Sequence, residues 1–275
     1  MPLSIQTNVT ALFAEQNLAV NTDFQAQTIQ RLTSGFRINR SGDDAAGLAV
    51  ANQYRSNINE LQQGVRNAND GTSILQIIDG GLNNISQILD RLKTLATESA
   101  TDTFSGNRTT LNNEFTTLLT EIDRQAANIG LNAAGTYNKS LSVYIGGGNV
   151  AANSAVTIDL SGAGNTVDST GLTVNGKTVD TQANAKTAIT AINTAIGNLG
   201  LVQGTVGTGE NLLQYASSLA SSQITNTSAA QSRIRDADVA SEAANLTKAQ
   251  TLQQTSIAAL AQANAAPAAV LKLLA

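Results

Sequence analysis

Apolar residues recur at helical spacing through most of the chain. One series returns every seven residues, and a second series beside it slips by one residue partway along. The first comprises Leu61, Ala68, Leu75, Leu82, Leu89 and Ala96, and the second Ile58, Val65, Ile78, Ile85 and Leu92. Two adjacent apolar stripes predict a helix that packs lengthwise against other helices.

Two further segments follow the same pattern. The shorter has Leu111, Phe115, Leu118, Ile122 and Ile129, and the later has Ala185, Ile192, Leu199, Val206, Leu213, Ala220, Thr227 and Ile234. At about 1.5 Å per residue, the stretches 58–96 and 185–234 would span roughly 58 Å and roughly 75 Å. A compact globule of this length has a radius of gyration of only about 19 Å. The pattern therefore predicts an elongated helical rod.

Glycine residues within the predicted helices should destabilise them. Gly80 and Gly81 interrupt the earlier pattern, and five more crowd the later one: Gly197, Gly200, Gly204, Gly207 and Gly209. Because each interior glycine costs about 1 kcal/mol relative to alanine, we expect a bend or a break within 197–209.

The middle of the chain has the two-residue period of strands. Apolar residues alternate on both sides of Gly146-Gly147-Gly148, at Leu141, Val143 and Ile145 and then at Val156, Ile158 and Leu160. This predicts a β-hairpin. A second, tighter hairpin is predicted around Asn175-Gly176, a pair that suits a type I′ turn.

The two ends carry thin, alanine-rich apolar faces broken by Asn and Gln. The early face has Ile5, Val9, Leu12, Val20 and Phe24, and the late face has Val239, Ala243, Leu246, Ala249, Leu252, Ile257 and Leu260. Neither end buries enough apolar surface alone to offset its ordering entropy. We expect the terminal helices to pair with each other and with neighbouring copies, although simple docking on the rod is the alternative. The predicted fold class is mainly α: a coiled-coil or helical-bundle rod with a small β-hairpin region and paired N- and C-terminal helices.

Adjacent carboxylates occur in the segment Ser41-Gly42-Asp43-Asp44-Ala45-Ala46-Gly47. A glycine turn followed by Asp is typical of a helix start, where carboxylates cap free N–H groups and complement the dipole. Acid–base catalysis or a cation site is the alternative interpretation of this pair.

The amino-acid composition excludes most kinds of catalytic and metal site. The chain has no His and no Cys, so Ser-His-Asp triads, thiol nucleophiles and ordinary zinc or iron–sulfur sites are excluded. A net charge of -4 disfavours nucleic-acid binding. The N-terminus lacks the features of a Sec-type signal peptide, and the uncharged stretch 249–271 contains too many Gln and Asn residues for a membrane span.

Several blocks resemble the bacterial flagellins. Residues 31–50 read RLTSGFRINRSGDDAAGLAV, and Arg66-Asn67-Ala68-Asn69-Asp70-Gly71 is a second match. At the other end, residues 232–238, 248–254 and 260–264 read SRIRDAD, KAQTLQQ and LAQAN. These blocks occur in this order at both termini and are similar to the N- and C-terminal flagellin signatures.

The resemblance implies a short flagellin that has the core domains D0 and D1 and lacks the outer domains D2 and D3. Residues 1–43 would form the N-terminal D0 helix, residues 44–232 the D1 rod with its β-hairpin at about 140–180, and residues 233–275 the C-terminal D0 helix. The implied function is structural, with no enzymatic activity and no cofactor. The chain would polymerise with itself into an extracellular flagellar filament after type III export.

The resemblance also implies partners. They are the flagellar cap and hook-junction proteins, an export chaperone at the C-terminal segment, and Toll-like receptor 5, whose contact positions align with Arg91, Leu95 and Glu114. The residues expected in the assembly segments are Ile5, Val9, Leu12, Leu252, Ile257, Leu260, Leu271, Leu273 and Leu274.

Three alternatives belong to other classes. A hook–filament junction protein shares the N-terminal signature, but the match from Gln253 to Asn264 is closer to flagellin. An unrelated secreted coiled coil, such as a type III translocator, is the second. The third is an enzyme, but the metalloprotease motif that some flagellins carry needs two His residues, and this chain has none.

Overall fold

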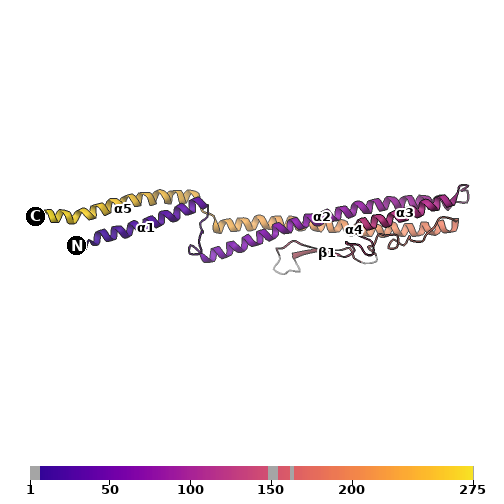
Figure 1. Cartoon of the computed structure of the whole chain (residues 1–275), viewed down its shortest axis with the longest axis horizontal. Helices are drawn as coiled ribbons and strands as arrows, with labels where there is room; N and C mark the ends of the chain where they lie inside the picture. Colours follow the sequence, from indigo (N-terminus) through magenta and orange to yellow (C-terminus); the bar gives the residue numbers. More distant parts are fainter. Residues whose placement is uncertain (1–6, 148–153, 162–163, 275) are drawn as a thin grey trace. The chain divides into compact units, whose positions relative to one another are not determined.

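The computed structural model describes residues 7–147, 154–161 and 164–274, with side chains up to residue 265. In this part of the chain there are five α-helices: α1 (Val9–Ser34), α2 (Ala45–Ser99), α3 (Arg108–Asn128), α4 (Gln182–Arg235) and α5 (Val239–Leu274). Two strands, β1 (Ser140–Tyr144) and β2 (Ala155–Asp159), form one antiparallel hairpin. The fold class predicted from the sequence, mainly α with a small hairpin and paired terminal helices, is confirmed (Figure 1).

The chain divides into two units. Unit 1 comprises residues 1–56 and 226–275, and unit 2 comprises residues 57–225. Both α2 and α4 contribute residues to each unit. The boundaries expected after residues 43 and 232 stay predictions.

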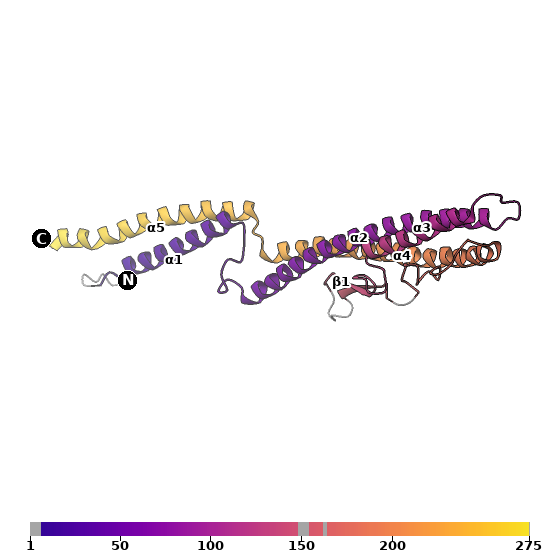
Figure 2. The same cartoon turned by 45° about the vertical axis from the view of Figure 1, so that its right-hand side comes forward.

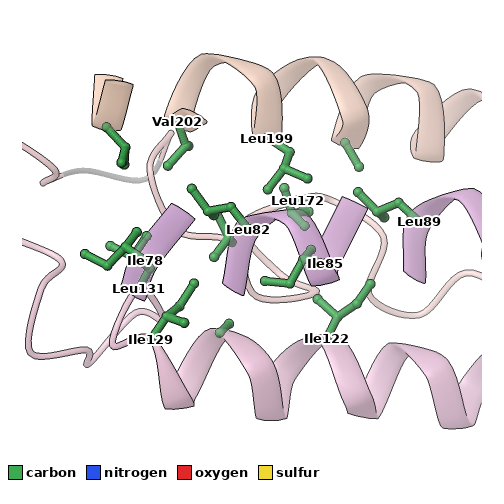
Figure 3. Close-up of a cluster of buried hydrophobic side chains, with 14 of the residues drawn as sticks. Ile78, Leu82, Ile85, Leu89, Ile122, Ile129, Leu131, Leu172, Leu199 and Val202 are labelled. Atoms are coloured by element: carbon green, nitrogen blue, oxygen red, sulfur yellow. The ribbon is translucent and has the colours of Figure 1, made fainter. Parts of the chain in front are cut away.

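In unit 2, α2, α3 and α4 lie side by side, as both views show (Figures 1 and 2). Their facing stripes form the core, in which Leu75, Leu82, Leu89, Phe115 and Ile192 are fully buried. Figure 3 shows α2 residues such as Ile78 and Ile85 between side chains from α3 and α4. The heptads read from the sequence therefore mark the core.

The glycine-rich part of α4 is helical without interruption, so the predicted break within 197–209 is wrong. Leu199, Val202, Val206 and Leu213 are buried along this stretch. Burial of each such side chain contributes about 1.5–3 kcal/mol, whereas each glycine costs about 1 kcal/mol. Core packing outweighs the poor helix propensity.

The predicted hairpin between Leu141 and Leu160 is confirmed, with Val143 paired to Val156 and Leu141 to Ile158. It packs on α2 and α4. A side chain at Gly64 of α2 would overlap the Ile145 carbonyl, and one at Gly209 of α4 would lie 3.0 Å from Ile158.

The second predicted hairpin is wrong: residues 171–180 form turns and no strand. The Lys177 N–H donates to the Val174 carbonyl at 3.2 Å. Only Gly176 of the two central residues has positive φ (+70°), which fits a type II turn and excludes type I′. Leu172, Val174 and Val179 are buried against the helices, so this segment covers the bundle as a loop.

That loop is tied to the bundle by hydrogen bonds. The Val179 N–H donates to Asn112 Oδ1 at 2.9 Å, and Ser99 Oγ donates to the Val179 carbonyl at 2.5 Å.

The described residues between β2 and α4 form loop structure alone, in keeping with the expected absence of outer domains. None of the helices in the described ranges has the length and apolar character needed to cross a membrane.

Candidate assembly surface

In unit 1, α1 and α5 run antiparallel, side by side (Figures 1 and 2). Three polar contacts cross the seam between them at intervals. Asn8 Nδ2 donates to the Ala263 carbonyl at 2.7 Å, Asn21 Nδ2 donates to Ser256 Oγ at 2.9 Å, and an Arg31 guanidinium nitrogen lies 3.5 Å from Glu242 Oε1. The terminal helices therefore pair as the sequence predicted, and these polar contacts accompany half-buried apolar residues of the two helices, such as Leu18, Phe24 and Leu260.

The seam buries little apolar side chain. Along α1 the buried residue is Thr28, and along the described side chains of α5 the buried residues are Glu242 and Ala249. Large apolar residues of the same helices are instead exposed: Val9, Leu12, Phe13, Val20, Ile29, Val239, Leu252 and Ile257. These exposed apolar side chains are available for contacts with another copy of the chain.

On α1 the exposed apolar residues follow helical spacing. Val9, Phe13 and Val20 are four and seven residues apart, which places them on one face. Leu12 lies beside them, and an open groove lined by Val9, Leu12, Phe13, Glu15, Gln16 and Ala19 runs along this face. We call Val9, Leu12, Phe13 and Val20 the outer face of α1. Asn21, which bonds α5, lies about a quarter to a third of a turn round the helix from Val9, Phe13 and Val20.

The predicted assembly residues fall into three groups. Val9, Leu12, Leu252 and Ile257 are exposed. Leu260 is half-buried, at heptad distance from other half-buried positions of α5. Ile5 lies outside the described residues, as do the side chains of Leu271, Leu273 and Leu274. Sequence reasoning did not select Phe13, although it continues the spacing set by Val9.

The two connectors of unit 1 are joined to each other, which the sequence did not indicate. Phe36 and Asp236 form an antiparallel bridge, the Arg37 N–H donates to the Arg235 carbonyl at 2.6 Å, and the Ala237 N–H donates to the Gly35 carbonyl at 2.9 Å. The Arg235 guanidinium stacks over the Phe36 ring, 4.1 Å from its centroid. Cation–π stacking of this kind adds to the backbone pairing.

Of the two carboxylates before α2, Asp44 caps the helix and Asp43 holds the turn that precedes it. Asp44 Oδ1 accepts from the Gly47 N–H at 2.8 Å at the start of the helix. Asp43 Oδ2 accepts from the N–H groups of Arg40 and Asn39, each at 3.0 Å. These two backbone donors hold the pKa of the Asp43 carboxyl below its usual value. The arrangement confirms the helix-start interpretation.

The three residues expected to meet a receptor differ in exposure. Arg91 and Glu114 are exposed and pair with each other across α2 and α3, with 2.6 Å between Nη2 and Oε1. Leu95 is 1% exposed and belongs to the core of unit 2. The structure therefore brings Arg91 and Glu114 together on the surface and places Leu95 beneath it.

These features define a mainly α-helical structural protein whose two terminal segments pair with each other. The sequence matches the family of the bacterial flagellin N-terminal helical region over residues 5–134, and that of the bacterial flagellin C-terminal helical region over residues 189–274. The chain belongs to the bacterial flagellin family.

Relatives match along almost their whole length. A flagellin from Halalkalibacterium halodurans is 34% identical over 98% of this chain and 99% of the relative. A flagellar filament 30.7 kDa core protein from Treponema maltophilum is 33% identical over the same shares, and a Listeria innocua flagellin is 34% identical over 99% of both. A crystal structure of Bacillus cereus flagellin matches with a TM-score of 0.48 and 28% identity, covering 60% of this chain and 94% of that chain.

Proposed function

We propose that this chain polymerises with copies of itself into the filament of a bacterial flagellum, and that unit 1 is the part that drives the polymerisation. The function is structural, as in the family. Unit 2 supplies a helical body with its own core, and unit 1 supplies the contact between copies.

One observation carries this proposal. The outer face of α1 is apolar and exposed, while the pairing of α1 with α5 fully buries few residues of either helix. Removing apolar surface from water contributes about 25 cal/mol per Å², and within one copy half or more of each outer-face side chain stays exposed. Neighbouring copies that cover the outer face would stabilise unit 1 and the polymer together.

The contacts between copies would be heterologous, with one patch meeting a different patch on the next copy. Only such contacts repeat into an open helical filament, whereas twofold contacts close on themselves. The outer face of α1 would then meet exposed apolar residues elsewhere on unit 1 of a neighbour, such as Leu252 and Ile257 of α5.

A polymerisation assay with matched variants tests the proposal. Phe13→Asp places a charge in the outer face, and we expect it to abolish filament formation, because burial of an unpaired charge is strongly unfavourable. Thr22→Asp adds the same charge nine residues along, about half a turn round α1 from Phe13, and should polymerise normally. Electron microscopy and sedimentation read the outcome. Normal filaments from Phe13→Asp would contradict the proposal.

Because the chain belongs to the flagellin family, the proposal also includes its secretion and its binding to further partners. The chain would be exported through the flagellar type III apparatus with a chaperone at its C-terminal segment, and would meet cap and hook-junction proteins outside the cell. The thin seam of unit 1 supports export, because a weakly packed segment unfolds at low cost.

A second role concerns the exposed pair of Arg91 and Glu114. We propose that Toll-like receptor 5 binds this surface of the monomer, as the family resemblance implies. Both side chains are exposed, and Arg is the cation best suited to bidentate pairing with a carboxylate. Leu95 would act by shaping the helix surface from below, because it is buried in the core.

A further inference from the structure

A line of exposed apolar side chains runs along the solvent side of α4 in unit 2. Leu201, Leu212, Tyr215 and Leu219 are 72%, 46%, 74% and 60% exposed. Their spacings of eleven, three and four residues place all four on one face of the helix. The buried residues Leu199, Val206 and Leu213 lie on the other side. Exposed apolar lines of this length on a helix mark interaction surfaces.

The same helix is almost without charge. Between Lys186 and Arg233 the only charged residue is Glu210, although a typical soluble domain is about one-quarter charged. Depletion of charge combined with exposed aromatic and aliphatic side chains is the composition of the centre of a protein interface. The solvent side of α4 thus has the composition of a surface that is covered in the assembled state.

A groove beside this line gives the surface its shape. It measures about 470 Å³ and lies between β2 and α4, with Leu201, Gly204, Thr208 and Leu212 of α4 and the carboxylate Asp159 of β2 among its lining residues. A side chain added at Gly200 or Gly204 would meet nothing within 4 Å, so packing within the chain does not require glycine there. Glycine at these positions lets an incoming group approach the helix backbone closely.

The occupant of the groove must present an apolar side chain without a carboxylate nearby, because Asp159 lines the groove and would repel a second negative charge. Of the exposed large apolar residues in the described part of unit 2, two lie outside α4: Ile77 and Tyr144. The Tyr144 hydroxyl donates to Glu60 at 2.9 Å, which places a carboxylate beside it. Ile77 of α2 is 66% exposed, and its face carries Ser73, Gly80 and Asn84 at helical spacing.

The lengths of the two surfaces match. The uncharged face around Ile77 extends from Asp70 to Arg91, about 30 Å along α2, and the apolar line from Leu201 to Leu219 extends about 27 Å along α4. The geometry points to a second copy of this chain as the occupant: Ile77 of one copy enters the groove beside Leu201 and Gly204 of the next. This inference rests on the proposed polymerisation and names a contact in it that is separate from unit 1.

Disulfide trapping tests the contact, and the absence of native cysteine makes the experiment clean. We would prepare Ile77→Cys, Leu201→Cys and Thr208→Cys as separate full-length variants, copolymerise the first with each of the others, and oxidise the filaments. A disulfide requires Cα atoms within about 7 Å. Because each variant carries a single cysteine, any disulfide must join two copies of the chain. We expect a shift from monomer to dimer mass on a non-reducing gel for at least one mixture.

Two controls define the background. Filaments of each variant alone should give no dimer, because a heterologous contact does not bring a residue against its own copy. Thr97→Cys replaces Ile77→Cys in the second control, since position 97 lies about 30 Å further along α2 and on another side of the helix. If Ile77→Cys fails to copolymerise, Ser73→Cys, one turn earlier on the same face, takes its place.

Each outcome decides the inference. A dimer in the mixtures that both controls lack supports the contact between α2 and α4. Filaments that form normally but give no dimer in any mixture overturn it and leave the polymerisation proposal intact. If the unmodified protein itself forms no filaments, the proposed function fails and this inference fails with it.

Discussion

Exposure distinguishes residues that the sequence treats alike. Val9, Leu12 and Leu260 all belong to apolar faces of the terminal segments, yet the first two point outward and the third lies partly in the seam. Periodicity identifies an apolar face but cannot say whether it is covered within one chain or by another. Phe13 fits the spacing of Val9 but was not selected, and Leu95, named through the family resemblance, is buried.

The Arg91 surface gives a prediction at this scale. Arg91→Ala should abolish or strongly reduce the Toll-like receptor 5 response to purified monomer in a reporter-cell assay. Exposed ion pairs contribute only about 0–1 kcal/mol, so loss of the Arg91–Glu114 pair should leave the fold intact, as circular dichroism would verify. Lys93→Ala, two residues away, serves as the control. Equal responses from Arg91→Ala and the unmodified monomer would remove this role.

At the scale of elements, long helices were predictable and irregular segments were not. The seven-residue repeats located α2 and α4, and alternation located β1 and β2, because these patterns reflect which side is buried. The segment around Asn175 also alternates, but its apolar residues bury themselves against helices without pairing in a sheet. Its fixed position depends on Asp123 and Asn112, which accept hydrogen bonds from Ser169 and Val179. Such distant partners are not visible in local sequence.

The contact between the hairpin and α2 gives the second prediction. Gly64→Ala should destabilise unit 2 by about 1–3 kcal/mol, because the added methyl overlaps the Ile145 carbonyl and forces the hairpin away. Gly207→Ala is the matched control in α4, where the methyl meets nothing within 4 Å; it should stabilise by about 1 kcal/mol. Urea denaturation measures both. Equal effects of the two changes would show that the hairpin does not depend on this approach.

At the scale of the whole molecule, the two units differ in how much each can stabilise itself. Unit 2 has a continuous core drawn from three helices and the hairpin, whereas the buried apolar residues described in unit 1 are Ile38, Ala51 and Ala249. The sequence indicated this difference through the thin faces of its ends. It did not reveal the bridge between Phe36 and Asp236, since residues so far apart carry no local signal of pairing.

Hydrogen exchange tests that difference. In the monomer at low concentration, amides of residues 1–40 and 240–275 should exchange rapidly while those in the core of α2 stay protected, because local opening is easiest where little is buried. In the filament both sets should be protected. The backbone hydrogen bonds that join residues 35–37 to residues 235–237 provide an internal reference for the exchange rates of the two sets. Strong protection of both ends in the dilute monomer would contradict the prediction.

The seam between α1 and α5 has a consequence for mechanics. Small or polar residues recur along the α5 side at Glu242, Ala249, Ser256 and Ala263, seven residues apart, so a slide of α5 by one heptad would present a similar surface to α1. The large apolar side chains of the two helices, such as Leu18, Phe24 and Leu260, are at most half-buried. Their register is set by the bonds of Asn8, Asn21 and Arg31 across the seam. Loss of these three contacts should therefore make it easier for the two helices to shift lengthwise against each other while each stays helical.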